Sequence, residues 1–163
     1  MKVLTLIRHA KSNWKNAYLA DIDRPLNKRG KRDAPMMGKR LAQRGYYTDV
    51  VVSSPAVRAL ATAEAIAVEI EYPLEEIVVD ERLYGADVTD WFEVIHNLDN
   101  ALDQVMCIGH NPGLTDLVDY LAPYQVGHVP TCGIVDLTFD VDQWALVGRV
   151  EPAKMSFDYP KAA

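Results

Sequence analysis

Long apolar runs are missing from this sequence. The apolar stretches are of strand length, too short to cross a bilayer as a helix, so we expect no contact with a membrane. The segment that begins at Met1 is apolar over too few residues before Arg8 interrupts it, which predicts no signal peptide and a cytoplasmic location. No repeat, low-complexity tract or linker-like stretch interrupts the 163 residues, so we predict one domain over residues 1–163.

Cysteine is scarce, and several ligand patterns are missing with it. Cys107 and Cys132 are too few for a disulfide framework, so we expect reduced, buried thiols. Neither cysteine opens a phosphate loop that ends in arginine, which disfavours a cysteine-dependent phosphatase. The sequence has no histidine pair at helical spacing, no carboxylate-rich ligand cluster and no P-loop, so we expect no metal site and no nucleotide-binding loop.

Basic residues are unevenly distributed. The net charge of −6 argues against a general nucleic-acid binder. Residues 1–60 nevertheless contain 13 of the 17 basic residues and 4 of the 23 acidic ones, a formal charge of +9, whereas the remainder carries −15. Such a cationic region can attract an anionic substrate. The alternative is that its helical members are only a solvated face, formed by Lys28, Arg29, Lys31, Arg32, Lys39, Arg40 and Arg44.

Short β-branched runs alternate with helical patterns, which indicates a mostly parallel sheet. The sequence predicts strands over 3–8, 49–53, 76–80 and 104–109, followed by a closing hairpin of 134–139 with 144–150. Helices are expected over 28–44, from 55 onwards, over 88–98 and from 112 onwards. The predicted fold class is α/β: a three-layer α/β/α sandwich around about six strands, one of them antiparallel.

Capping residues mark where the helices begin and end. Asn27 is expected to cap the first helix and Gly45 to end it, while Pro35 should kink or locally break it. Ser54-Pro55 and Asn111-Pro112 each place a capping side chain before a proline, a pattern typical of a helix start.

Candidate catalytic residues follow three of the predicted strands. Arg8-His9 ends the first strand, Arg58 lies in the helical turn after the second, and His110-Asn111 follows the fourth. Ligands of open α/β sheets bind at the carboxyl ends of strands, and helix starts there favour anions. Two arginines, two histidines and two helix starts at one edge therefore predict a phosphate site.

Each residue type suits a particular task at such a site. The planar fork of arginine donates paired hydrogen bonds to phosphate oxygens. Neutral imidazole is a competent nucleophile, and we assign this role to His9, with its Nδ1 held by an acceptor. His110 is assigned as a donor to the transferring phosphoryl group. Taken singly, each residue has a structural explanation as well; His96 and His128 lack such neighbours and are expected to be structural or exposed.

The motifs resemble those of a known family. Leu6-Ile7-Arg8-His9-Ala10-Lys11-Ser12 is similar to the Arg-His signature of the histidine phosphatase superfamily. Three further blocks follow in the order typical of that family: Arg24-Pro25-Leu26-Asn27 with Gly30, Ser53-Ser54-Pro55 with Arg58 and Thr62, and Gly109-His110-Asn111-Pro112-Gly113. The chain length and the residues of these blocks resemble those of the SixA-type phosphohistidine phosphatases most.

The resemblance implies a phosphohistidine intermediate on His9, with Arg8, Arg58, His110 and Asn111 binding the phosphoryl group and no metal or organic cofactor. Larger relatives protonate the leaving oxygen with a carboxylic acid. Glu81 is the best positional candidate for that acid, and Asp21 and Asp23 are weaker ones. Without a firm acid, phosphohistidine or an aryl phosphate is a better substrate than an alkyl phosphate.

Two alternatives stay open. One is a phosphoglycerate mutase-like enzyme or a small-metabolite phosphatase, although the short chain leaves little room for segments that exclude water. The other is a non-catalytic module that binds phosphate or a phosphoprotein. The expected partner is thus a phosphorylated protein or a small phosphorylated molecule, and the sequence leaves the oligomeric state open.

Overall fold

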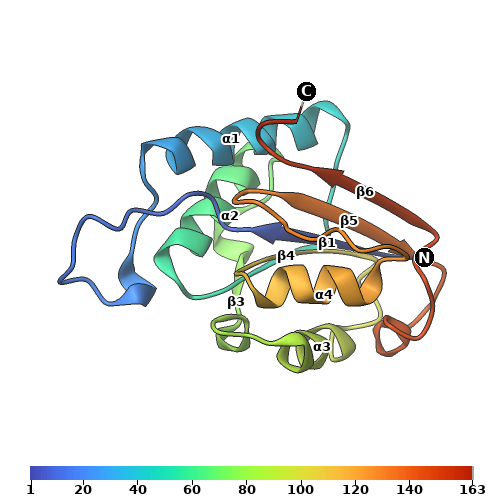
Figure 1. Cartoon of the computed structure of the whole chain (residues 1–163). Coiled ribbons are helices and arrows are strands. Elements are labelled where there is room, and N and C mark those ends of the chain that lie inside the picture. The colour runs from blue at the N-terminus through green and yellow to red at the C-terminus, as the bar shows by residue number, and fades with distance from the viewer. Residues whose placement is uncertain (163) are drawn as a thin grey trace.

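A six-stranded sheet forms the centre of the computed structural model, which describes residues 1–162 (Figure 1). The strand order is β3-β2-β4-β1-β5-β6, and β5 is the one strand that runs in the opposite direction to the other five. The strands are β1 Lys2–Arg8, β2 Val50–Ser53, β3 Val78–Val79, β4 Gln104–Gly109, β5 Ile134–Phe139 and β6 Lys154–Asp158. The predicted sheet, mostly parallel with one antiparallel strand, is confirmed.

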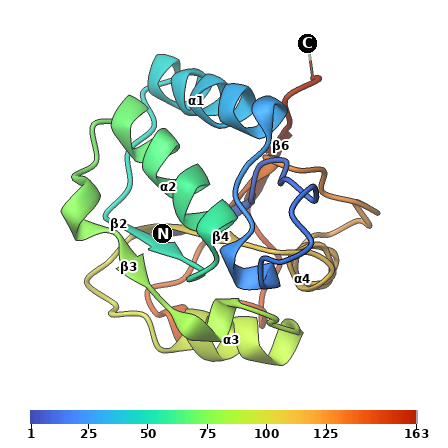
Figure 2. The same cartoon turned by 90° about the vertical axis from the view of Figure 1, so that its left-hand side faces the viewer.

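Helices cover both faces of the sheet and complete the predicted three layers (Figure 1, Figure 2). One face carries α1 (Lys28–Gln43) and α2 (Val57–Glu69), and the other carries α3 (Val88–His96) and α4 (Gly113–Leu121). Each face has its own apolar core because side chains alternate along β1: Leu4 and Leu6 belong to the α3–α4 core, whereas Ile7 belongs to the α1–α2 core.

Helix α1 keeps its predicted ends but not its predicted kink. The Asn27 side chain accepts a hydrogen bond of 2.9 Å from the Gly30 N–H, and Gly45 follows the helix at a φ of 72°. The predicted break at Pro35 is wrong: α1 is one continuous helix from 28 to 43. Burial of Ala34, Met37 and neighbouring side chains against α2 stabilises the helix across the missing N–H.

Two predicted strands differ from the structure. The third predicted strand shrinks to two exposed residues of β3, because this edge strand has a neighbour on one side only and no cover over its side chains. The predicted hairpin partner of β5, residues 144–150, is wrong. Trp144 begins a short 3₁₀ helix (Trp144–Leu146), and its fully buried indole donates a 2.8 Å hydrogen bond to the Leu102 carbonyl. The partner of β5 is β6 instead.

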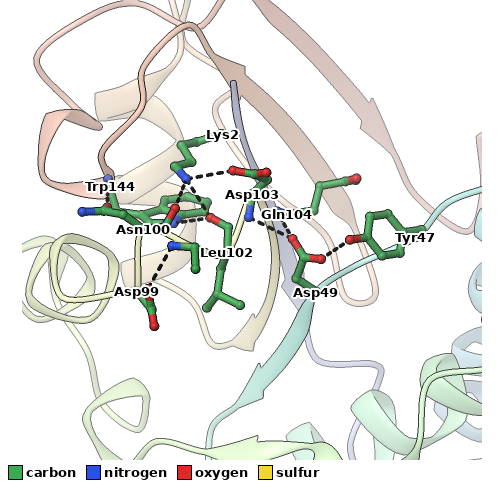
Figure 3. A network of polar contacts seen from close by, with 10 residues as sticks. Lys2, Tyr47, Asp49, Asp99, Asn100, Leu102, Asp103, Gln104 and Trp144 are labelled. Atoms are coloured by element: carbon green, nitrogen blue, oxygen red, sulfur yellow. Dashed lines mark hydrogen bonds and ion pairs between the residues drawn. The ribbon is translucent and has the colours of Figure 1, made fainter.

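The amino ends of β1 and β4 are joined by a polar network (Figure 3). The buried Lys2 Nζ donates to the carbonyls of Asn100 and Leu102 at 2.6 and 2.9 Å, and to Asp103 Oδ1 at 2.9 Å. Asp49 Oδ2 accepts from the N–H groups of Asp103 and Gln104. The buried donors of this network are satisfied within the protein, so we interpret the network as structural.

The opposite end of the sheet carries the candidate site. Residues 9–27 form a loop that projects beyond the carboxyl end of β1, drawn in blue on the left of Figure 1. Throughout residues 1–162, no helix is both long and apolar enough to cross a membrane.

Candidate active site

The predicted basic residues converge at the carboxyl ends of the parallel strands, the end that faces the viewer in Figure 2. Arg8 ends β1 and pairs in register with Gly109 of β4, so His9 and His110 follow neighbouring strands. The cleft between them has a volume of about 350 Å³. It is lined by Arg8, His9, Lys11, Ser12, Trp14, Asp21, Arg24, Arg58, His110, Asn111 and Thr131.

The His9 ring is held in one orientation. Its Nδ1–H donates a 2.7 Å hydrogen bond to the Ala10 carbonyl, so the lone pair lies on Nε2. Burial, reinforced by the charges of Arg58 and Arg8, lowers the pKa of His9 to about 3. His9 is therefore a neutral imidazole at physiological pH, the form that attacks an electrophile.

His110 lies beside His9, with the ring centroids 5.0 Å apart. The distance from His110 Nε2 to Ser54 Oγ is 2.7 Å, and the Ala56 N–H donates to that hydroxyl oxygen at 3.2 Å. If the Ser54 hydroxyl donates its hydrogen to Nε2, the ring hydrogen of His110 lies on Nδ1, and we assign this tautomer to His110. Burial, together with the charge of Arg58, lowers the pKa of His110 to about 4, so this ring is also neutral.

Three buried donors in the cleft lack a partner within the protein. Among residues 1–162, the buried polar side-chain atoms without a hydrogen bond are Arg8 Nε, Arg58 Nε, His110 Nδ1 and Trp91 Nε1. The first three belong to residues that line the cleft. Because buried donors are normally satisfied, unpartnered donors on three residues of one cleft fit a site for an anion with several acceptor oxygens.

Thr62 connects the end of β1 to α2. Its hydroxyl accepts from the Ala10 N–H at 3.0 Å and donates to the Arg58 carbonyl at 2.8 Å. Both contacts are buried, so Thr62 fixes the turn that carries His9 relative to the helical turn that carries Arg58.

Asp21 joins the cationic side chains at the mouth of the cleft. Its carboxylate accepts from Arg58 NH2 and Arg24 Nε, both at 3.0 Å, and from the Tyr84 hydroxyl at 2.6 Å. The hydrogen bond from Tyr84, followed by those from Arg58 and Arg24, holds the pKa of Asp21 well below its ordinary value. Asp21 is thus ionised in this arrangement, and its carboxylate accepts hydrogen bonds from both arginines.

Ser54 does not cap a helix as the sequence predicts, whereas the Asn111 side chain does accept from the first turn of α4. Helix α2 begins at Val57, so Ser54 contacts His110 instead of capping the helix. The Asn111 amide donates to the Val129 carbonyl at 2.9 Å, and its oxygen accepts from both the backbone and the hydroxyl of Thr115. Arg8 donates to the same carbonyl at 3.1 Å, so Asn111 positions the loop that holds Arg8.

The structure does not bring the other acid candidates into the cleft. Glu81 and Asp23 are exposed, and neither is among the residues that line it. His96 donates to the Val147 carbonyl at 2.8 Å and packs against Phe92, outside the cleft. His128 is exposed, as expected.

Sequence reasoning placed Arg24 in a family block without giving it a role, and it overlooked Tyr84. Arg24 is buried and donates to Ser12 Oγ at 2.8 Å as well as to Asp21. Tyr84 follows β3, so the strand-end rule that singled out Glu81 also covers this segment. The contact between Tyr84 and Asp21 spans two irregular segments far apart in the chain, which no local pattern predicts.

Comparisons with known sequences agree with this geometry. The model of the histidine phosphatase superfamily (branch 1) matches residues 4–104. The uncharacterized protein Rv1276c of Mycobacterium tuberculosis is 33% identical over 116 residues, which cover 71% of this chain and 70% of that protein. A 2,3-bisphosphoglycerate-dependent phosphoglycerate mutase of Gloeothece citriformis is 37% identical over 73 residues, 44% of this chain but 31% of the mutase.

Solved structures share the fold over most of its length. A candidate phosphohistidine phosphatase SixA from Agrobacterium tumefaciens is 27% identical with a TM-score of 0.77, covering 83% of this chain and 90% of that one. The protein histidine phosphatase SixA in complex with tungstate superimposes with a TM-score of 0.78 at 24% identity, covering 96% and 94% of the two chains. Taken with the family match, these findings show that the chain belongs to the histidine phosphatase superfamily and has a SixA-like fold.

Proposed function

We propose that this protein is a phosphatase that removes phosphoryl groups from phosphohistidine in proteins, through a covalent intermediate on His9. The observation that carries the proposal is the neutral His9 ring with its free Nε2, in a cleft lined by three residues that each have a buried, unpartnered donor: Arg8, Arg58 and His110. Superfamily membership supports phosphatase or mutase chemistry in general.

The reaction has two displacement steps in this proposal. The His9 Nε2 lone pair attacks phosphorus, and the bond from phosphorus to the leaving nitrogen breaks. The leaving imidazole, protonated on its other nitrogen, departs neutral. Water then attacks the phosphorus of phospho-His9, the bonding pair returns to Nε2, and phosphate leaves with both protons of the water. The donors of Arg8, Arg58 and His110 stabilise the charge on the equatorial oxygens in both steps.

The state of Asp21 favours phosphohistidine over an alkyl phosphate. An alkoxide leaves slowly unless an acid protonates it, and such catalysis contributes about 10²–10⁴-fold. Asp21 is the one carboxyl group among the described residues that line the cleft, and its hydrogen bonds keep it ionised. Transfer from phosphohistidine to His9 needs no such acid, because one bond between phosphorus and nitrogen replaces another.

The substrate class is tested with two peptides of identical sequence, one carrying phosphohistidine and the other phosphoserine. The expected kcat/KM is at least about 100-fold higher for phosphohistidine, after subtraction of its spontaneous hydrolysis. His9→Ala should lose turnover, whereas His128→Ala, at an exposed position outside the cleft, should keep it. A preference for phosphoserine refutes the proposal, and binding without turnover in the unmodified protein identifies a binding module.

A phosphoglycerate mutase-like activity is the second candidate, because mutases are among the sequence relatives. The similarity covers 31% of that mutase, so most of the mutase has no counterpart in the matched region. Incubation with 3-phosphoglycerate separates the two functions: a mutase forms 2-phosphoglycerate, whereas the proposed phosphatase does not.

A further inference from the structure

A second groove lies directly beside the catalytic cleft. It has a volume of about 750 Å³ and shares Lys11, Ser12 and Trp14 with the lining of the cleft. From there it extends along the loop to the first turn of α1, as far as Lys31. A substrate residue bound in the cleft thus has neighbouring groups within reach of this groove.

The groove is strongly cationic in an acidic protein. Its described lining residues include no carboxylate and five basic side chains: Lys11, Lys15, Lys28, Arg29 and Lys31. Arg29 is paired with Asp33 at 3.4 Å, but in residues 1–162 the four lysines form no ion pair, and all four are exposed. The protein carries a net charge of −6, so composition alone does not explain this concentration of positive charge.

The loop that forms one wall is ordered by its own contacts. Ser12 pairs with Leu26 in an antiparallel bridge, and the Asn13 N–H donates to the Pro25 carbonyl at 2.8 Å. The Arg24 guanidinium lies 3.3 Å from the centre of the Trp14 ring and holds it in place. The groove is therefore formed before any ligand arrives, which lowers the entropic cost of binding.

Exposed apolar side chains on the same loop indicate a macromolecular ligand. Trp14 is 71% exposed, Tyr18 99% and Leu19 39%. Aromatic residues exposed beside a binding site are typical of protein interfaces, where they bury large areas at little entropic cost. A small metabolite held in the cleft would leave Tyr18 and Leu19 uncovered, because neither residue lines it.

From these observations we infer that the groove binds an acidic peptide segment next to the phosphorylated residue of a protein substrate. This inference rests on the proposed function and adds a specificity: carboxylates of the substrate pair with Lys15, Lys28 and Lys31 while the phosphoryl group enters the cleft. Exposed pairs of this kind contribute modestly one by one, so three of them together are expected to change affinity by about tenfold.

The test uses two fluorescent phosphohistidine peptides, with either acidic or serine residues beside the phosphorylated position. Binding is measured by fluorescence anisotropy and turnover by phosphate release, for the unmodified protein and for the triple variant Lys15→Glu, Lys28→Glu, Lys31→Glu. The unmodified protein should bind the acidic peptide about tenfold more tightly, mainly at low salt. The triple variant should lose this preference, with its fold checked by thermal unfolding.

A matched control separates the groove from overall charge. Lys39→Glu, Lys154→Glu, Lys161→Glu changes the net charge equally at exposed positions outside the groove, and it should keep the preference. The inference is overturned if the unmodified protein binds the two peptides with equal affinity. It is also overturned if both triple variants lose the preference for the acidic peptide to the same extent. A groove variant that loses affinity for inorganic pyrophosphate but binds the peptides unchanged also overturns the inference. Absence of turnover with an intact binding preference counts against the proposed function alone.

Discussion

At the residue scale, the hydroxyl of Ser54 decides which nitrogen of His110 faces the substrate. Ser54 Oγ lies 2.7 Å from His110 Nε2, whereas His110 Nδ1 is buried and without a partner among the described residues. A neutral imidazole donates from one nitrogen only. With Ser54 as the donor to Nε2, the hydrogen of the neutral ring lies on Nδ1, and we expect this tautomer to donate to the bound phosphoryl group.

Ser54→Ala is expected to lower kcat on the phosphohistidine peptide by about fivefold, because one neutral hydrogen bond contributes about 1 kcal/mol. The second expected effect is a mixture of His110 tautomers, measured by ¹⁵N NMR of the ring nitrogens. Ser53→Ala is the matched control: its hydroxyl donates to the Ser54 carbonyl and does not contact His110. Equal effects of the two substitutions would show that Ser54 has no role in orienting the ring.

The individual residues also show how far sequence reasoning reaches. Arg8, His9 and His110 stand at the ends of strands with clear apolar patterns, so their convergence follows from the parallel sheet. Asp21 and Tyr84 meet across 63 positions of the chain, and neither lies in a regular strand or α-helix. Such contacts depend on the course of irregular loops, which local patterns do not determine.

At the element scale, the first turn of α1 packs backbone against backbone on the start of the loop formed by residues 9–27. A Cβ atom on Gly30 would lie 2.2 Å from the Lys11 carbonyl oxygen, and the Asn27 N–H donates to that same oxygen at 3.0 Å. Glycine at position 30 is therefore required by this close approach. The helix start and the loop that lines the cleft form one unit.

Gly30→Ala is expected to reduce the free energy of unfolding by about 1–3 kcal/mol, although alanine is the better helix former. It should also lower kcat/KM, since Lys11 lines the cleft. Gly38→Ala, on the same helix, places its Cβ 3.0 Å from Glu69 Cβ and 3.1 Å from Ile66 Cα, a less severe approach than the 2.2 Å at Gly30. Urea unfolding compares the two variants, and an equal or smaller loss for Gly30→Ala would contradict the role assigned to the close approach.

The elements differ in how well local pattern predicts them. The pattern predicts β4 and β5 with their observed bounds and α1 to within a residue of its end. It fails at residues 144–150, where an apolar run resembles a strand but Trp144 fills the core between the sheet and α3. Burial by distant segments determines that outcome, so the tertiary structure overrides the local preference.

At the scale of the whole molecule, the two buried imidazoles make stability depend on pH. The ordinary pKa of histidine is about 6.5, whereas His9 and His110 titrate at about 3 and about 4 in the folded protein. As the pH falls below about 6.5, the unfolded chain binds protons that the folded chain does not. This contribution to the free energy of unfolding is complete above about pH 6.5. It is lost as the pH falls through the pKa values that His110 and His9 have in the folded protein.

His110→Asn should therefore flatten the pH dependence of the unfolding free energy by about 1.4 kcal/mol per pH unit, between about pH 6 and about pH 4.5. The measurement is urea unfolding in buffers free of phosphate and sulfate, because either anion would bind the cleft. His128→Asn, at an exposed position, serves as the control and should follow the unmodified protein. Parallel curves for all three proteins would mean that His110 is not kept neutral in the folded state.

The central claim is that phosphorus becomes bonded to residue 9, and trapping that bond tests it most directly. The protein is mixed with a phosphohistidine peptide, quenched in alkali during turnover, digested and analysed by mass spectrometry. We predict a phosphoryl group on the peptide that contains His9, lost on acid treatment and missing in His9→Ala. A phosphoryl group on another residue, or full turnover in His9→Ala, would contradict the account.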